Sequence, residues 1–457
     1  DSRRNGGNRL FGTVIGGLLG MALFRIYLLV HPNGGYSLLL VPLVFVGTVL
    51  LIVLCQIFWV GGVQPGGVVL CTMRMKQILE YDTDNFVVRV QPGVLLNDLA
   101  EDALKQGLLY PPDPGEKFAT LGGNVSTNAG GMRAVKYGAT RDYVRAMTVV
   151  LPTGEIVKMG ATVSKTSSGY SLLNLIIGSE GTLGIITELT LKLIPAPKQT
   201  VSLICPFEDL ATCISTVPLF KKAHMDPQAL EFFEREILIS SEEYLGKAVF
   251  PRNIGGQDVG AYLLVTFDAN TQDAIDALVE QAAELVVEAG AMDVLVADTP
   301  AKMKDAWAAR SSFLEGIEEQ TKLLDECDVV VPVSKIADFV LYIKEIDKEF
   351  DFEVKMFGHA GDGNLHVYTC SVDMEMDAFV KQVDQFMRKL YAKTTELGGQ
   401  ISGEHGIGVS KRPYFLRQTA KENLQAMNAV KSALDPLHIL NNGKSYLTGG
   451  NDNAGTF

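Results

Sequence analysis

Hydrophobic and polar residues are distributed unevenly, with an apolar stretch near the start of the chain. Between residues 26 and 73 there is no Asp, Glu, Lys or Arg, and residues 36–60 are predominantly apolar. This run is long enough to cross a bilayer. Residues 10–30 are a second candidate span, which Arg25 interrupts. Because Arg and Lys lie on the outer flanks, residues 10–60 are compatible with a membrane hairpin whose two ends are cytoplasmic.

Two other interpretations of the apolar stretch stay open. It is also compatible with a buried core of strands that are covered on both faces. Alternatively, it is foreign to the fold and comes from a chimeric or misread reading frame. A signal peptide is disfavoured, because no convincing small-residue cleavage site follows the run.

After residue 73 the pattern changes to alternating strands and helices, which predicts an α+β protein. A turn at residues 84–85 separates two strands, and Gly107 ends the first helix. Gly290 and the glycine pair at 398–399 end two later helices. The predicted strands are 78–82, 86–90, 189–194, 328–331 and 354–357, and the predicted helices are 95–106, 272–289 and 376–397.

Three glycine-rich segments lie within a short stretch of the chain, at residues 120–131, 167–170 and 178–187. In such loops, backbone N–H groups can converge on an anion such as a pyrophosphate. Neither the phosphate-binding loop of nucleotide hydrolases nor the dinucleotide-binding fingerprint is present. One glycine run alone indicates tight turns. Three together favour a large phosphate-bearing cofactor that lies over a sheet.

Two glycine-rich motifs near the C-terminus contain three of the six histidines: GHAGDGNLH at 358–366 and SGEHGIG at 402–408. His359, His366 and Glu404 would form a set of two imidazoles and one carboxylate for a divalent metal. His405, beside this set, is suited to act as an acid or base. The alternative is that these are turn residues with buried, hydrogen-bonded histidines.

Composition narrows the class of protein. A chain of 457 residues is long enough for two or three domains. Its net charge of −13, with no basic stripe, argues against nucleic acid as a partner. None of the six cysteines forms a C-x-x-C pair, so neither a zinc finger nor an iron–sulphur ligand run is expected. Scattered cysteines are typical of a reduced, cytoplasm-facing protein, here with an additional membrane anchor if the hairpin forms.

From about residue 61 to 444 the motifs and their order resemble the FAD-dependent 2-hydroxy-acid dehydrogenases. This family includes the flavoprotein subunit of glycolate oxidase, D-lactate dehydrogenases and D-2-hydroxyglutarate dehydrogenase. The matching segments are 111–114, 122–124 with 128–131, 178–185, 358–366, 402–408 and 441–444.

The resemblance implies a fold. It consists of a two-part FAD-binding domain of the p-cresol methylhydroxylase type and a ferredoxin-like α+β cap. The family carries a first flavin-phosphate loop, of the type Arg-Gly-x-Gly-Thr, where this chain has the apolar run. We therefore expect an atypical apolar segment at 1–60 and an incomplete FAD-binding domain at 61–197. A substrate-binding cap with the metal site is expected at 198–448, and its C-terminal segment is expected to return to the flavin. Residues 449–457 are expected to be a disordered tail.

The resemblance also implies roles for individual residues. His359, His366 and Glu404 are expected to bind Zn, Mn or Fe, and His405 is expected to be the base. Arg310 is expected to hold the substrate carboxylate, which suits the planar guanidinium fork; its alternative is a solvated helix residue. The expected FAD contacts are Pro112, Thr120, Gly122, Gly123, Asn124, Thr127, Asn128, Ala129, Gly130, Gly131, Gly178, Glu180, Gly181, Gly184, Ile185 and Asn441.

The activity that the resemblance implies is oxidation of a D-2-hydroxy acid of the lactate or glycolate class to the 2-oxo acid, with hydride transfer to flavin. Because no iron–sulphur ligands occur in the chain, the electrons are expected to pass to an electron-transfer flavoprotein, an iron–sulphur subunit or a quinone. Two alternatives are a metal-dependent hydrolase that uses the histidine motifs without flavin, and a non-catalytic membrane-anchored remnant.

Overall fold

The computed structural model describes residues 67–444. The chain divides into two compact units, Asp1–Thr72 and Met73–Phe457, and the description below concerns the second. The predicted membrane hairpin within residues 10–60, the apolar segment expected to replace part of the FAD-binding domain, and the tail at 449–457 lie outside the described residues. Within residues 67–444 no helix is both long enough and apolar enough to span a membrane.

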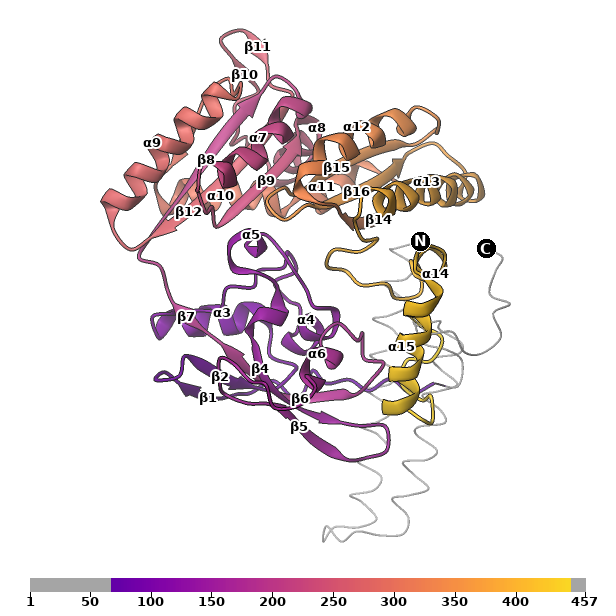
Figure 1. The fold of residues 1–457 in the computed structure, drawn as a ribbon. Coiled ribbons are helices and arrows are strands. Elements are labelled where there is room, and N and C mark those ends of the chain that lie inside the picture. Colours follow the sequence, from indigo (N-terminus) through magenta and orange to yellow (C-terminus); the bar gives the residue numbers. More distant parts are fainter. Residues whose placement is uncertain (1–66, 445–457) are drawn as a thin grey trace, which may run out of the picture. The chain divides into compact units, whose positions relative to one another are not determined.

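The first part of the second unit is an antiparallel five-stranded sheet, which we name the N-terminal sheet (Figure 1). Its spatial order is β1-β2-β6-β4-β5. Buried and partly exposed residues alternate along β6, as expected of a sheet with one face against a core. The strands are β1 (Ile78–Asp82), β2 (Val87–Val90), β4 (Val144–Val150), β5 (Ile156–Gly160) and β6 (Ile185–Lys192).

Short helices bury the apolar side chains of this sheet. Leu96, Leu99 and Ala103 of α3 pack into the same core as Leu121 and Val125 of α4. A separate two-stranded antiparallel ribbon pairs β3 (Leu108–Leu109) with β7 (Ile194–Pro195). The other elements are α3 (Leu96–Lys105), α4 (Leu121–Thr127), α5 (Ala134–Tyr137), η1 (Thr140–Tyr143) and α6 (Leu172–Ile176).

The remainder is built on an antiparallel seven-stranded sheet, the C-terminal sheet, in the order β13-β8-β12-β9-β15-β16-β14. The strands β9 and β15, at its middle, pair over only three residue pairs, which end with His359 opposite Glu231. The strands are β8 (Gln199–Phe207), β9 (Ala229–Glu234), β12 (Ala261–Ala269), β13 (Leu295–Ala297), β14 (Leu323–Val330), β15 (Glu353–His359) and β16 (Asn364–Ser371). A small hairpin, β10 (Asn253–Ile254) with β11 (Gln257–Asp258), stands apart.

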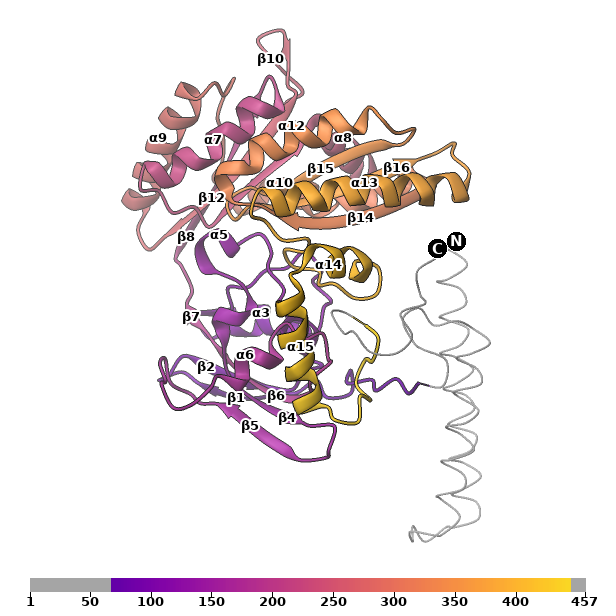
Figure 2. The ribbon, with the colours of Figure 1, turned by 45° about the vertical axis from the view of Figure 1, so that its right-hand side comes forward.

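Helices cover both faces of the C-terminal sheet, because alternate strand residues are buried on opposite sides. One face packs against four helices, which Figure 2 shows together: α7 (Leu210–Lys222), α9 (Gln272–Glu288), α12 (Ile336–Asp347) and α13 (Met376–Glu396). The other face packs against shorter helices: α8 (Arg235–Leu245), α10 (Pro300–Ser311) and α11 (Phe313–Gln320). A 3-10 turn, η2 (Val333–Lys335), precedes α12.

The C-terminal segment returns to the N-terminal sheet through α14 (Arg412–Gln418) and α15 (Lys421–Leu434). Lys431 of α15 is buried and donates hydrogen bonds to the carbonyls of Thr182 and Leu440, each at 2.7 Å. It also pairs with the buried carboxylate of Asp435. This single cation therefore anchors the last helix to the glycine-rich segment at 178–187.

Candidate active site

The first glycine-rich segment differs from the expected open loop, because most of it is the helix α4. Thr120 accepts a hydrogen bond from the N–H of Gly123 at 3.2 Å and so caps the helix. The N–H of Gly122 donates to the carbonyl of Pro92 at 2.8 Å, and that of Asn124 to the carbonyl of Thr120. These N–H groups are therefore not available to bind an anion. The side-chain amide nitrogen of Asn124, in contrast, is buried with no partner among the described residues.

After α4 the chain turns sharply at residues 128–131. Asn128 has a left-handed backbone (φ 55°), and its side-chain oxygen accepts the N–H of Arg141 at 3.0 Å. Gly131 has φ 116°, and a Cβ there would overlap the carbonyl oxygen of Asp113. Only glycine allows this close approach. The turn therefore lies directly against the segment that contains the buried Pro112.

The segment at 178–185 connects distant parts of the chain. The N–H groups of Gly178 and Glu180 donate to carbonyls of α4, at 2.9 and 2.8 Å. The Glu180 carboxylate accepts the N–H groups of Ile407 and Gly408, both at 2.8 Å. Asn441 donates to the carbonyl of Glu180 at 2.9 Å. The expected cofactor residues Glu180 and Asn441 are thus bonded to other parts of the protein.

Backbone conformation and close packing explain why glycine occupies two further positions of that segment. Gly181 has φ 67°, and a Cβ there would lie 3.0 Å from the side chain of Asn441. At Gly184 a Cβ would overlap Val149 of β4, so glycine allows β6 to begin at Ile185 directly beside that strand.

Strand periodicity places the histidines on one face of the C-terminal sheet. His366 of β16 lies opposite Phe357 of β15 and opposite Asp328 of β14. Phe357 and Tyr368 belong to the core beneath α8, α10 and α11. His359 follows Phe357 by two residues, so its side chain has the same direction.

Three donor atoms converge on this face. The Nε2 atoms of His359 and His366 lie 3.4 Å apart, and Oε1 of Glu404 lies 3.5 and 3.3 Å from them. All three side chains are at least nine-tenths buried. Such spacings match the edges of a coordination tetrahedron with bonds of about 2.1 Å. None of the described residues donates a hydrogen bond to the other carboxylate oxygen, Oε2 of Glu404.

Acidic side chains surround the two histidines. Burial alone would lower the pKa of His359, but the carboxylates of Glu231 and Glu404 hold it well above its usual value. Burial would raise the pKa of Glu404, but the two imidazoles hold it well below its usual range. Nδ1 of His359 lies 2.8 Å from Glu231, so Nε2 is the nitrogen that faces Glu404. The cluster thus attracts positive charge, which a divalent cation would supply.

Arg310 on α10 is buried, which excludes the alternative of a solvated helix residue. Its Nε and Nη2 both contact Oε2 of Glu231, at 2.8 and 2.7 Å. The guanidinium carbon lies 4.7 Å from the ring centre of Phe357. Arg310 is therefore fixed beside the histidine cluster by an ion pair and a cation–π contact.

Asp328, with no exposed surface, organises the second histidine motif. Its Oδ2 accepts the N–H groups of Gly403 and Glu404 at 2.6 Å and that of His405 at 3.1 Å. Lys411 forms a buried ion pair with the same carboxylate. Burial would raise the pKa of Asp328, but Lys411 and these donors lower it. Asp328 therefore sets the positions of both Glu404 and His405.

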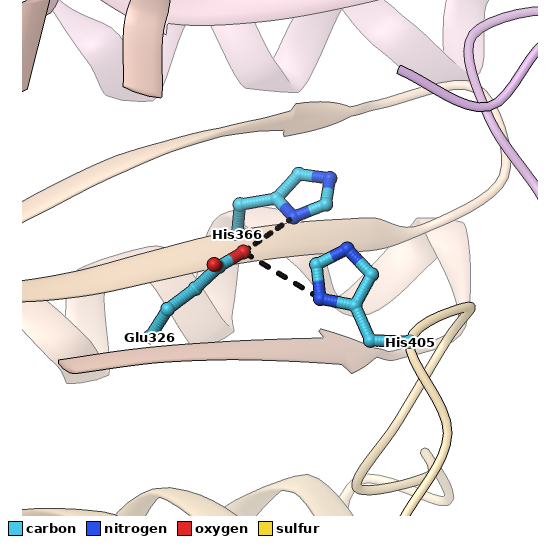
Figure 3. Close-up of side chains that lie close together, drawn as sticks. All are labelled: Glu326, His366 and His405. Atoms are coloured by element: carbon cyan, nitrogen blue, oxygen red, sulfur yellow. Dashed lines mark ion pairs between the residues drawn. The ribbon is translucent and has the colours of Figure 1, made fainter. Parts of the chain in front are cut away.

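One carboxylate oxygen of Glu326 faces the rings of both His366 and His405 (Figure 3). Its Oε1 is 3.7 Å from Nδ1 of His366, 3.5 Å from Nδ1 of His405, and accepts a hydrogen bond from the Tyr368 hydroxyl at 2.9 Å. Burial would raise the pKa of Glu326, but the two histidines lower it. With Nδ1 directed at Glu326, the Nε2 of His405 lies on the side of Glu404, 3.8 Å away.

A cavity of about 430 Å³ brings these groups together. One wall comes from α4 and the turn that follows it, and includes Asn124, Thr127 and Ala129. The opposite wall carries Arg310, Glu326, His359, His366, Glu404 and His405. The predicted metal and catalytic residues therefore line one cavity. Of the expected cofactor residues, Asn124, Thr127 and Ala129 line it.

The two walls of the cavity coincide with two known domains. Residues 57–160 match the FAD binding domain, and residues 196–445 match the C-terminal domain of FAD linked oxidases. The chain belongs to the FAD-linked oxidase family. Over 387 residues it is 66% identical to a D-lactate dehydrogenase from Anaerostipes hadrus, with 84% of this chain and 82% of that protein covered.

Two further proteins are less similar to this chain. Glycolate oxidase subunit GlcD of Bacillus subtilis is 39% identical, with 84% of this chain and 81% of that protein covered. Among solved structures, an alkyldihydroxyacetonephosphate synthase aligns with a TM-score of 0.60 and 18% identity, covering 81% of this chain and 67% of that one. This last similarity concerns the fold alone.

Three acids at the site were not found from the sequence: Glu231, Glu326 and Asp328. Glu231 is buried in β9, whose other residues are mostly apolar. An unpaired charge at such a position would be costly. Glu326 and Asp328 occupy alternate positions of β14. A charged residue inside an apolar strand is the signal that would have identified Glu231. β14 contains three acids, so this contrast does not single out Glu326 or Asp328.

Proposed function

We propose that this protein is an FAD-dependent dehydrogenase that oxidises a D-2-hydroxy acid, with D-lactate as the first candidate, to the 2-oxo acid. The supporting observation is the cavity, because one wall belongs to the matched FAD binding domain and the other carries Arg310, the three-residue cluster and His405. The 66% identity to a D-lactate dehydrogenase supports the substrate class. Family membership favours this function over a metal-dependent hydrolase.

We propose that His359, His366 and Glu404 hold a divalent cation. The equal spacing of their donor atoms and the unpartnered Oε2 of Glu404 fit such an ion. Glu231 is hydrogen-bonded to Nδ1 of His359, as carboxylates behind metal-binding histidines commonly are, and Glu326 lies 3.7 Å from Nδ1 of His366. Zn, Mn and Fe all accept such a ligand set. A bound cation would supply Lewis acidity toward the oxygens of the substrate.

The side chains of the cavity then have distinct roles. Arg310 keeps donors beyond those bonded to Glu231, and these pair with the substrate carboxylate. His405 removes the hydroxyl proton at Nε2, because its Nδ1 faces Glu326 and Asp328. The 2-hydroxy acid becomes the 2-oxo acid when its hydroxyl loses this proton and its Cα loses a hydride. FAD, when bound, supplies the acceptor for the two electrons.

For FAD itself, the unpartnered side-chain amide of Asn124 in the cavity is a donor that fits a polar cofactor atom. We propose that residues 127–131 and 178–181 approach the cofactor through their backbone. Electrons would leave through an electron-transfer flavoprotein, an iron–sulphur subunit or a quinone.

The strand order supports the finer description of the fold that the resemblance implied. The elements β8-α7-β9-β12-α9-β13 follow a β-α-β-β-α-β order with the spatial order β13-β8-β12-β9. The elements β14-α12-β15-β16-α13 repeat it, and Gln400 bridges Val330 in place of a last strand. We propose that the C-terminal sheet is a pair of ferredoxin-like units and that the first domain is of the p-cresol methylhydroxylase type.

The visible spectrum of the purified full chain tests the proposal. Anaerobic D-lactate should bleach a flavin band near ~450 nm, since the electrons must reach the ring. His405→Ala should retain the band and lose the bleaching. His438→Ala, in the loop that follows α15, should behave as the unchanged chain. A colourless protein, or a band that D-lactate leaves intact, would contradict the proposed function.

A further inference from the structure

We propose that Glu326 restricts the substrates of this enzyme to 2-hydroxy acids with an uncharged side chain, by repelling a second carboxylate. This inference rests on the proposed function and concerns the substrate class that the same cavity accepts. It follows from where the carboxylate of Glu326 is held and from which other charges line the cavity.

Glu326 is fixed in the wall rather than free to turn away. It extends from β14, where it pairs with Tyr368 of β16, and the Tyr368 hydroxyl donates to its Oε1 at 2.9 Å. The Nδ1 atoms of His366 and His405 lie within 3.7 Å of the same oxygen (Figure 3). The side chain is 29% exposed, and the exposure is toward the cavity that it lines. A substrate bound beside His405 therefore lies close to this carboxylate.

The Lys and Arg side chains of the cavity lining provide for only one substrate carboxylate. Among the described residues that line it, Arg310 is the only Lys or Arg, and Glu231 already engages its Nε and Nη2. Acidic residues are more numerous: Glu116, Glu315, Glu326 and Glu404. The carboxylate at C1 of a 2-hydroxy acid would occupy the available donors of Arg310. A second carboxylate would find no lysine or arginine in this lining and would lie near Glu326.

The expected size of the effect follows from electrostatics. Two like charges about 6 Å apart, at the effective dielectric constant of about 20 that suits such sites, repel by an amount equivalent to about a hundredfold in kcat/KM. Water and added salt reduce the effect, so a discrimination between tenfold and a hundredfold is expected at low ionic strength, and less at high ionic strength.

Two substrates of the same shape isolate the charge. D-malate and its C4 monoamide differ only in whether the group at C4 is a carboxylate or a carboxamide. We expect the full chain, assayed with an artificial electron acceptor, to oxidise the monoamide at least about tenfold more efficiently than D-malate. In Glu326→Gln this ratio should fall to within about threefold of one. Equal efficiency for both compounds in the unchanged enzyme would overturn the inference.

The controls separate a local charge from other effects of Glu326. Glu116→Gln and Glu315→Gln remove the same charge from exposed positions of the cavity lining and should leave the ratio within about twofold. If Glu326 only positioned His405, Glu326→Gln would lower the efficiency for both compounds equally and leave the ratio unchanged, which contradicts the inference. D-lactate is assayed in parallel. If the proposed function is wrong, neither D-lactate nor the monoamide is oxidised; if only the inference about Glu326 is wrong, D-lactate is still oxidised.

Discussion

The carboxylate of Glu231 lies 2.8 Å from Nδ1 of His359, and the two residues are also directly opposite each other in the pairing of β9 with β15. The same carboxylate holds Arg310. One buried acid therefore orients both a proposed metal ligand and the proposed carboxylate-binding residue.

Replacing Glu231 should weaken metal binding without removing a ligand. In Glu231→Gln we expect about 10- to 100-fold lower affinity for the divalent cation, because the imidazole of His359 loses its carboxylate partner. Titration of the metal-free protein with Zn or Mn, followed by the metal content after dialysis, measures this. Glu234→Gln is a matched control, because Glu234 ends the same strand and pairs with Lys344 away from the site. Equal affinities in both variants would contradict a role for Glu231 behind the ligand.

Asp328 should be essential for the stability of the second histidine motif. In Asp328→Asn the buried Lys411 loses its partner, and we expect about 3–5 kcal/mol lower free energy of unfolding in urea denaturation. Activity should fall as well, since Glu404 and His405 are held through their N–H groups. Lys411→Met alone and in combination with Asp328→Asn forms a double-mutant cycle. A coupling energy near zero would contradict the ion pair.

The buried Lys431 should hold the C-terminal segment in place. In Lys431→Met the buried carboxylate of Asp435 loses its cationic partner and two carbonyls lose a donor, which we expect to cost about 3 kcal/mol or more in unfolding free energy. Lys421→Met, at an exposed position of the same helix, should change stability by no more than about 0.5 kcal/mol. Limited proteolysis should cut the Lys431 variant first near residues 435–444. Similar stabilities of the two variants would refute the anchoring role.

The stability that Asp113 contributes should depend on pH. Burial would raise its pKa, but Arg133 and Lys117 lower it below its usual value. The folded state therefore binds this proton less readily than the unfolded chain, so the contribution is present above the unfolded pKa of about 3.9 and is lost as the pH falls through the folded value.

The comparison of melting temperatures tests this sign. Asp113→Asn should melt at a lower temperature than the unchanged chain near neutral pH, and the difference should shrink below about pH 4. Asp84→Asn, in an exposed turn, provides a reference. A difference for Asp113→Asn that grows with acidity would show that the sign of the pKa shift is wrong.

Elements with a strong local signal could be predicted closely from the sequence. The helices expected at 272–289 and 376–397 occur as Gln272–Glu288 and Met376–Glu396. Both have long amphipathic patterns and end beside glycine, so local information sufficed. The helix α4 was missed, because Gly, Asn, Ser and Thr are poor helix formers. Its helix depends on contacts with Pro92 and on hydrogen bonds from residues 178 and 180, which the local pattern does not contain.

The same limit applies to the site. His359 and His366 are close in sequence, and the structure brings Glu404 to them, as the motifs suggested. Glu231 contacts His359 across 128 residues of sequence, and Asp328 contacts Glu404 across 76. Such contacts depend on the order of strands in the sheet, and no periodicity along the chain specifies that order.

The three residue pairs between β9 and β15 join the elements β8-α7-β9-β12-α9-β13 to the elements β14-α12-β15-β16-α13, and the pair of Glu231 with His359 is the last of the three. The proposed metal site is consequently composite, since Glu231 belongs to the first of these groups of elements, whereas His359 and His366 belong to the second. A fragment that contained only one of the two groups of elements would therefore lack either Glu231 or both histidines.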